Sequence, residues 1–285
     1  MSDVNEVVRQ FMPWSISKAD LAKKCPRAFK YKYVDRIRTA SGTEARVGTA
    51  AHRSTELQRQ GVQAVEAEET AIREAKDLTV DELEDLASLR LNIDAYVRRI
   101  EGYKQRHGNI IFEGQEIRTA IDLKGQLTGY DSPDAFMRGS IDDSLEHETG
   151  LTLIVDHKFG KLKAAADYDP QLKTYTVLYA AARPSARELH SGIHFGRFEF
   201  LDWHKRYPAD YARKVLTPWL KSYVEAAAAG LGTFEPKPQR LCPWCDYFDR
   251  CAEGQAFCKE KGYKRTKKKK PAPRKPAELP VVYDE

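Results

Sequence analysis

Two neighbouring stretches of the 285-residue chain decide the fold: Gly139-Ser140-Ile141-Asp142-Asp143 and, after a turn, Leu151-Thr152-Leu153-Ile154-Val155-Asp156-His157-Lys158. The apolar run at residues 151–155 is nearly continuous, which is typical of a strand buried on both faces. Because side chains alternate along a strand, Asp156 and Lys158 share one face. If the two stretches form adjacent strands, Asp142 lies close to Asp156. The sequence therefore predicts two carboxylates and a lysine at one place on a sheet.

This group of side chains predicts a metal-dependent hydrolytic site. Two carboxylates that point together repel each other unless a cation joins them, and their oxygens suit Mg²⁺ or Mn²⁺. A lysine at position 158 could then orient an attacking water and stabilise charge on phosphorus, so we expect phosphodiester hydrolysis. Strand alternation points Asp143 to the opposite face, which favours Asp142 as the ligand. Taken alone, Asp156-His157-Lys158 is also compatible with an ordinary strand end facing solvent.

The rest of the chain predicts an α/β fold. Ser17 and Asp20 fit a capping box at the start of a helix that Cys25-Pro26 interrupts, and an aromatic–basic stretch follows up to residue 34. Apolar residues spaced by three or four between residues 83 and 100 are typical of an amphipathic helix, within a helical region at 65–102. Further helices are expected from residue 48 and over residues 171–182 and 211–229, and further strands over residues 110–119, 134–145 and 191–203.

Four motifs resemble those of the RecB-like branch of the PD-(D/E)XK nuclease superfamily, which includes the AddB nuclease domain and the CRISPR-associated iron–sulfur exonucleases. They are Gly48-Thr49-Ala50-Ala51-His52 (G-T-x-x-H), residues 139–142 (G-x-x-D), Asp156-His157-Lys158 (D-x-K) and residues 171–175 (Q-x-x-x-Y). The resemblance covers residues 15–251. It implies a restriction-endonuclease-like mixed sheet flanked by helices, with residues 65–102 as a helical insertion.

The resemblance also implies roles for individual residues. The implied metal ligands are His52, Asp142 and Asp156, the implied catalytic lysine is Lys158, and the implied substrate-positioning groups are Gln171 and Tyr175. We expect His157 to face the metal with its backbone carbonyl rather than its ring. Many members of the superfamily have Glu where this chain has Asp156. A lone histidine on a helix, such as His52, is more often a surface or core residue than a ligand.

Residues 1–10 show no secretion signal, so we expect a cytoplasmic protein. In such a protein an odd number of cysteines, here five, indicates a metal site rather than a disulfide framework. The spacing C-x2-C-x5-C of Cys242, Cys245 and Cys251 lets one loop wrap a metal or cluster. Cys258 would complete a local zinc site of four cysteines. Cys25 would instead complete a long-range site that ties the start of the chain to its end. The resemblance favours a [4Fe–4S] cluster held by Cys25, Cys242, Cys245 and Cys251, with a mainly structural role.

The charge of the chain is unevenly distributed. Lys and Arg number 47 against 42 Asp and Glu, a net charge of +5. Residues 259–275 contain ten basic residues and one acidic residue, so this segment carries +9 and the rest of the chain −4. With its prolines, the segment predicts a disordered tail at 259–285 after a single nuclease domain at 1–258. The tail either adds salt-sensitive affinity for nucleic acid or serves only solubility.

A second basic stretch lies near the N-terminus. Its lysines and arginine alternate with aromatic residues: Lys23, Lys24, Arg27, Phe29, Lys30, Tyr31, Lys32 and Tyr33. Such residues contact phosphates and stack on bases in single-strand binding proteins. A helix end with solvated charges and buried rings explains the pattern equally well.

Together these patterns predict a metal-dependent DNA exonuclease that acts on single strands or DNA ends in recombination, repair or phage DNA processing. The sequence contains no G-x-x-x-x-G-K-[ST] motif, so unwinding would need a separate helicase. Its apolar runs are far shorter than the roughly 20 residues of a membrane span. The alternative is a non-catalytic DNA-binding or adaptor protein that retains the fold and has a zinc site.

Overall fold

The computed structural model of the protein describes residues 4–39 and 42–265. The chain forms two units, Met1–Lys237 and Pro238–Glu285. Among the described residues, no helix combines the length and apolar character that a membrane span needs.

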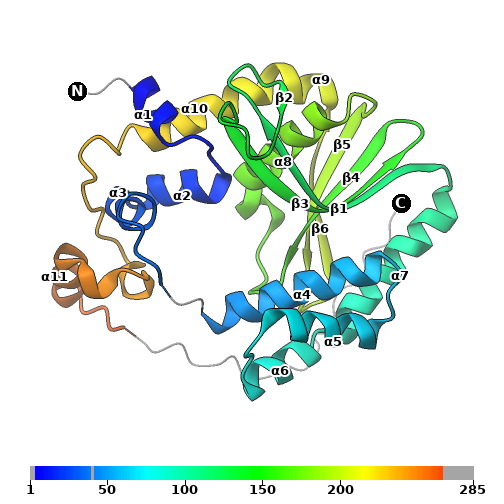
Figure 1. The fold of residues 1–285 in the computed structure, drawn as a ribbon, viewed down its shortest axis with the longest axis horizontal. Helices are drawn as coiled ribbons and strands as arrows, with labels where there is room; N and C mark the ends of the chain where they lie inside the picture. The colour runs from blue at the N-terminus through cyan, green and yellow to red at the C-terminus, as the bar shows by residue number, and fades with distance from the viewer. Residues whose placement is uncertain (1–3, 40–41, 266–285) are drawn as a thin grey trace. The chain divides into compact units, whose positions relative to one another are not determined.

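The first unit is built on a six-stranded mixed sheet flanked by helices, as the sequence predicts (Figure 1). The strand order is β2-β1-β3-β4-β5-β6, and β4–β5 is the parallel pair while the other pairs are antiparallel. The strands are β1 (Ile110–Ile121), β2 (Leu127–Thr128), β3 (Met137–His147), β4 (Leu151–Lys158), β5 (Glu188–Phe195) and β6 (Phe200–Pro208). Strand β4 is buried from Thr152 to His157, in agreement with its apolar run.

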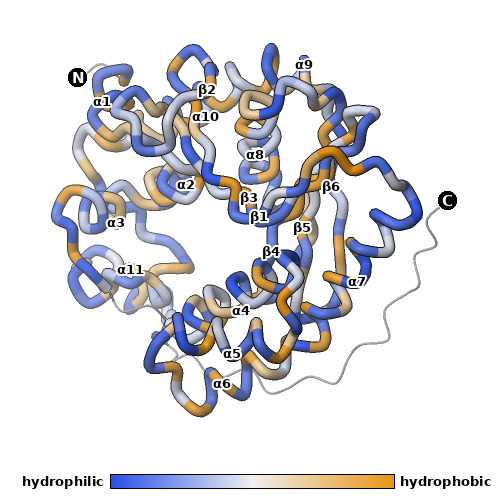
Figure 2. The backbone as a smooth tube through the Cα atoms, turned by 45° about the vertical axis from the view of Figure 1, so that its right-hand side comes forward, coloured by the Kyte–Doolittle hydropathy of each residue, from blue (hydrophilic) through white to orange (hydrophobic). Residues whose placement is uncertain are grey.

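Helices pack on both faces of this sheet (Figure 1). They are α1 (Val4–Gln10), α2 (Ile16–Lys24), α3 (Pro26–Phe29), α4 (Thr43–Arg59), α5 (Ala64–Ala75), α6 (Val80–Ala87), α7 (Arg90–His107), α8 (Asp169–Ala182), α9 (Ala209–Tyr211) and α10 (Thr217–Ala228), with short η1 (Lys30–Val34), η2 (Ala165–Tyr168) and η3 (Ala212–Leu216) segments. On one face, Leu178 of α8 and Leu220 of α10 share a core with Ile154. On the other, Tyr96 of α7 packs with Val155. Helices α4 to α7 intersperse hydrophilic and hydrophobic residues, as amphipathic helices do (Figure 2).

Three local predictions differ from the structure. The apolar pattern over residues 83–100 is not one helix, because the chain turns at Ser88 and Leu89 between α6 and α7. Leu89 is itself buried, so the spacing reflects burial on either side of the turn. The single strand expected over residues 191–203 is two strands, β5 and β6, joined by a turn at residues 196–199. Helix α2 begins after Ser15 rather than Ser17, since the Ser15 hydroxyl accepts a hydrogen bond from the Lys18 amide at 3.3 Å.

The aromatic residues after Cys25 belong partly to the core. Phe29 is fully buried, and its ring centroid lies 4.9 Å from that of Tyr33. Burial removes the Phe29 ring from contact with DNA bases. This part of the basic–aromatic stretch therefore follows the core interpretation.

The second unit contains three short elements, η4 (Cys242–Trp244), η5 (Phe248–Arg250) and α11 (Ala252–Glu260). None of the five cysteines of the chain forms a disulfide bond. Cys251 caps α11, and its Sγ accepts a hydrogen bond from the Gly254 amide at 3.3 Å. Helix α11 extends past Cys258 to Glu260, and residues 266–285 of the predicted tail lie outside the described residues.

Candidate active site

The sheet brings Asp142 of β3 and Asp156 of β4 together. Asp143 pairs with Val155 in the antiparallel register, so one step further along the ladder Asp142 lies across from Asp156. The His157 amide donates a hydrogen bond to Asp142 Oδ2 at 2.7 Å, which fixes the β3 carboxylate to the backbone of β4. Asp156 is only 1% exposed. Burial and the charge of Asp156 raise the pKa of Asp142 well above its usual value.

Lysine and glutamine side chains hold Asp156 in place. Lys158 Nζ forms an ion pair with Asp156 Oδ2. The Gln171 amide donates to Asp156 Oδ1 at 2.7 Å and to Tyr175 Oη at 2.9 Å. Gln171 and Tyr175 are one turn apart on α8, which places both on the same face of that helix. Burial acts to lower the pKa of Lys158, but the charges of Asp156 and Asp142 raise it above its usual value, so the ammonium form is kept.

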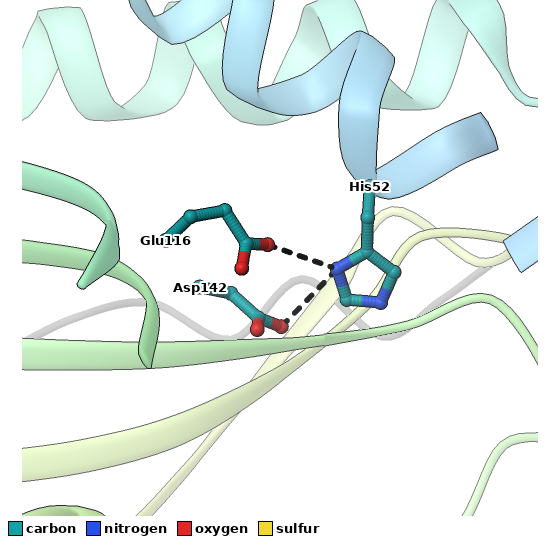
Figure 3. A group of neighbouring side chains, drawn as sticks. All are labelled: His52, Glu116 and Asp142. Atoms are coloured by element: carbon teal, nitrogen blue, oxygen red, sulfur yellow. Dashed lines mark ion pairs between the residues drawn. The ribbon is translucent and has the colours of Figure 1, made fainter. Parts of the chain in front are cut away.

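Helix α4 brings His52 to the same place (Figure 3). His52 Nδ1 lies 3.3 Å from Asp142 Oδ2 and 4.0 Å from Glu116 Oε1. His52, Glu116 and Asp142 each offer one ligand atom, and these atoms lie within 4.8 Å of one another. Burial lowers the pKa of His52, partly offset by the charge of Asp156, and therefore favours the neutral imidazole that metals bind.

Glu116 is a site residue that the sequence motifs do not identify. It belongs to β1, where Ile117 pairs with Ile141, and this register places Glu116 beside Asp142. The Ser140 hydroxyl donates to Glu116 Oε2 at 2.8 Å, and burial raises the pKa of Glu116. Its φ of 48° lies in the left-handed region that few non-glycine residues adopt. Strand β1 carries a second acidic residue, Glu113. The sequence alone does not show which of the two belongs to the site.

The residues adjacent to the two aspartates point elsewhere. Asp143 Oδ2 accepts hydrogen bonds from Arg59 Nε at 2.7 Å and from Tyr96 Oη at 2.9 Å, in a buried ion pair. The His157 ring places Nδ1 3.0 Å from His194 Nδ1 and packs edge-on against Tyr96. Burial and the neighbouring histidines lower the pKa of His157 well below its usual value. That the His157 carbonyl faces a metal stays a prediction.

The sequence profile of the PD-(D/E)XK nuclease superfamily matches residues 13–252. The chain belongs to this superfamily. Among solved structures, it is similar to a proposed exonuclease from Eubacterium rectale, with 14% identity, 85% of this chain and 89% of that chain covered, and a TM-score of 0.46. It is also similar to a protein named SSO0001, with 11% identity, 88% and 97% covered, and a TM-score of 0.34. The chain matches no curated protein.

As a PD-(D/E)XK protein, the chain has a donor set that fits a divalent cation. Carboxylate oxygens are the ligands that Mg²⁺ and Mn²⁺ prefer, and a neutral imidazole is a common metal ligand. Burial, and after it the charges of neighbouring carboxylates, raise the pKa values of Asp142 and Glu116. A cation would relieve that repulsion. His52, Glu116 and Asp142, whose ligand atoms lie within 4.8 Å of one another, are therefore the residues that would hold it, and a ligand role for Asp156 stays a prediction.

Two cysteines of the second unit, Cys242 and Cys251, lie close to Gly254. A Cβ atom at Gly254 would lie 3.3 Å from Cys251 Sγ and 3.7 Å from Cys242 Sγ, so glycine leaves room between α11 and both sulfurs. Cys258 is buried, and burial together with the charge of Cys242 raises the pKa of its thiol. Cys25 belongs to the first unit, where it joins α2 to α3. The cysteine-rich region is thus present, as the sequence predicts.

Proposed function

We propose that the protein is a Mg²⁺- or Mn²⁺-dependent DNA exonuclease of the RecB-like, AddB-like branch, and that it resembles the iron–sulfur exonucleases. The observation that carries this proposal is the convergence of His52, Asp142, Asp156 and Lys158 from three elements at one buried place. These residues come from three of the four motifs, and they meet although His52 and Lys158 are about a hundred residues apart in the sequence.

The residues of the site have distinct parts in the proposed reaction. A bound divalent cation supplies neutralisation of phosphate charge and a water of lowered pKa. The protonated Lys158 presents N–H donors to the phosphate as its negative charge grows during attack. Gln171 fixes Asp156 by a neutral hydrogen bond, which orients the carboxylate and leaves its charge for the cation.

The proposed substrate is single-stranded DNA or a DNA end. Helices α5 to α7 follow α4, the helix that carries His52, and share its apolar cluster through Ala71, Leu86 and Ile93. A helical insertion packed against a catalytic helix would restrict entry of a duplex and favour a free strand. We place the protein in the cytoplasm, in recombination, repair or phage DNA processing, with a separate helicase supplying single strands.

For the cysteines we propose a structural [4Fe–4S] cluster held by Cys25, Cys242, Cys245 and Cys251. Their spacing supports the cluster, and so does the hydrogen bond from the Gly254 amide to Cys251 Sγ. Anaerobic purification with iron and sulfide analysis tests it. A colourless protein with stoichiometric zinc and no iron would reject the cluster and favour the zinc site completed by Cys258.

The nuclease proposal is tested with end-labelled single- and double-stranded DNA and Mg²⁺ or Mn²⁺. Asp156→Asn and Lys158→Ala should each lower the rate of degradation by about 10²–10³-fold, the usual effect of losing one preorganised electrostatic group. A matched control is the exposed ion pair of Lys214 and Asp210, with an N–O distance of 3.1 Å, where Lys214→Ala and Asp210→Asn should leave the rate unchanged.

Two results would contradict the proposal. Undiminished degradation by both site variants would place the activity outside this site, in a contaminant. A wild-type protein that degrades none of these substrates would favour the non-catalytic DNA-binding or adaptor function.

A further inference from the structure

A groove of about 370 Å³ begins beside Gln171, the residue that holds Asp156. Lys23 and Lys24 of α2, Tyr168 at the end of η2 and Tyr223 of α10 line it, together with Gln171. Asp20 and Asp167 face it as well. The groove therefore presents basic and aromatic side chains, and Gln171 connects it to the proposed catalytic residue Asp156.

Tyr168 lies close to the proposed catalytic lysine and to a second lysine. Its ring centroid is 5.5 Å from Lys158 Nζ and 5.6 Å from Lys163 Nζ. The Tyr168 side chain is half-buried, so part of it remains accessible. A flat ring close to two ammonium groups offers a nucleotide both a stacking surface for the base and positive charge for the adjoining phosphates.

A similar pair lies on α10 and α2. Lys23 Nζ is 3.8 Å from the ring centroid of Tyr223, and Tyr223 Oη donates a hydrogen bond to Asp20. The Trp219 ring supports Tyr223 at a centroid distance of 5.4 Å. This hydrogen bond to the Asp20 carboxylate fixes the orientation of the Tyr223 ring. The structure thus holds two oriented aromatic rings along the groove, each with a lysine beside it.

We propose that this groove binds the unpaired DNA strand that flanks the scissile phosphate. Tyr168 stacks on the base nearest the site, and Lys23 contacts a phosphate further along the strand. The volume is near the lower end of the 300–1,000 Å³ typical of small-ligand pockets, which is enough for one nucleotide. This inference rests on the proposed nuclease function and specifies the substrate as a single strand.

The test is binding of a fluorescein-labelled oligothymidylate to the full chain in EDTA, measured by fluorescence anisotropy without cleavage. Tyr168→Ala should raise the Kd about tenfold, the lower end of the effect of removing one stacked base contact. Tyr168→Phe keeps the ring and should bind within about twofold of wild type. Tyr211→Ala removes an exposed tyrosine on α9, outside the groove, and should leave the Kd unchanged.

Lys23 is tested by salt dependence. Loss of one phosphate contact on a single strand should lower the slope of log Kd against log salt concentration by about 0.7, and Lys23→Ala should show this change. Lys214→Ala removes a lysine of the same charge outside the groove and should keep the wild-type slope. If Tyr168→Ala does not fold, Tyr168→Leu keeps apolar bulk without an aromatic ring and replaces it.

The groove proposal is overturned if the Tyr168 and Lys23 variants bind the oligonucleotide as wild type does, or if wild type does not bind single strands. It is also overturned if Tyr168→Ala weakens binding of a blunt duplex by the same factor. Cleavage by the same preparations with Mn²⁺ separates this from the nuclease proposal. If the protein cleaves DNA while its groove variants bind normally, only the groove proposal is wrong. If it binds single strands through the groove without cleaving them, the nuclease proposal is wrong.

Discussion

Replacing Arg59 by methionine should destabilise the protein far more than removing a surface arginine. The Arg59 side chain is 0% exposed, and Asp143, whose carboxylate it binds at 2.7 Å, is 2% exposed. Tyr96 donates to the same carboxylate. Glu101 and Glu113 also contact the guanidinium, at 3.2 and 3.3 Å. Methionine would fill most of the volume and leave the Asp143 charge buried without its cation.

The size of the effect follows from this burial. Removing one partner of a buried ion pair costs about 3–5 kcal/mol in the free energy of unfolding. In a domain of this size each kcal/mol lowers the Tm by about 2–4 °C, so Arg59→Met should lower it by about 6–20 °C. Arg53 makes comparable ion pairs with Glu56 and Glu74 at the surface, at 2.7 and 2.8 Å. Arg53→Met should cost about 1 kcal/mol or less.

Thermal melts followed by circular dichroism in EDTA measure both variants. In the Arg59→Met background, the further change Asp143→Asn should recover most of the lost stability, because it removes the uncompensated charge and still accepts from Tyr96. The reasoning is refuted if Arg59→Met melts within about 2 °C of Arg53→Met, or if Asp143→Asn lowers the Tm of the double variant further.

Three further outcomes are expected. Glu116→Gln should weaken Mn²⁺ binding at least about tenfold in thermal-shift titrations, because it removes one carboxylate ligand, whereas Glu113→Gln should not change the midpoint of the titration. Burial and Asp156 raise the pKa of Asp142 well above its usual 3.8, so the metal-free folded chain keeps a proton that the unfolded chain releases. The contribution of Asp142 to the free energy of unfolding therefore falls as the pH rises above about 4, and Asp142→Asn should remove this contribution, so that the variant gains stability relative to wild type as the pH rises in melts in EDTA. Cys25→Ser should abolish bound iron and Cys258→Ser should retain it, and elemental analysis with the reverse result would favour the local zinc site.

The alternation of side chains along two strands predicts the residues at the centre of the site. Asp142, Asp156 and Lys158 could be placed together because two adjacent strands and a turn determine their positions, and Asp143 could be set apart for the same reason. The mixed sheet and its family followed from the ordered motifs.

The parts that sequence analysis missed depend on tertiary contacts. Glu116 comes to the site through the β1–β3 register, and no local pattern in β1 separates it from Glu113. The break at Ser88 is hidden because Leu89 keeps the apolar spacing across the turn. Phe29 shows the same effect, since its alternation with lysines does not reveal that its ring is buried in the core.

The groups that hold the carboxylates of the site in place are mostly neutral, and the charge balance of the site explains why. Ser140, the His157 amide and Gln171 hold the three carboxylates of Glu116, Asp142 and Asp156 with hydrogen bonds that bring no charge. Lys158 contributes one positive charge, and the lowered pKa of His52 keeps that ring neutral. With a divalent cation bound, all three carboxylates would be ionised, and together with one ammonium they would carry a net charge of −2, which that cation balances. Asp143, whose charge is already met by Arg59, adds nothing to this sum. The fold therefore separates an internally compensated aspartate from its neighbour, whose charge is left for a metal.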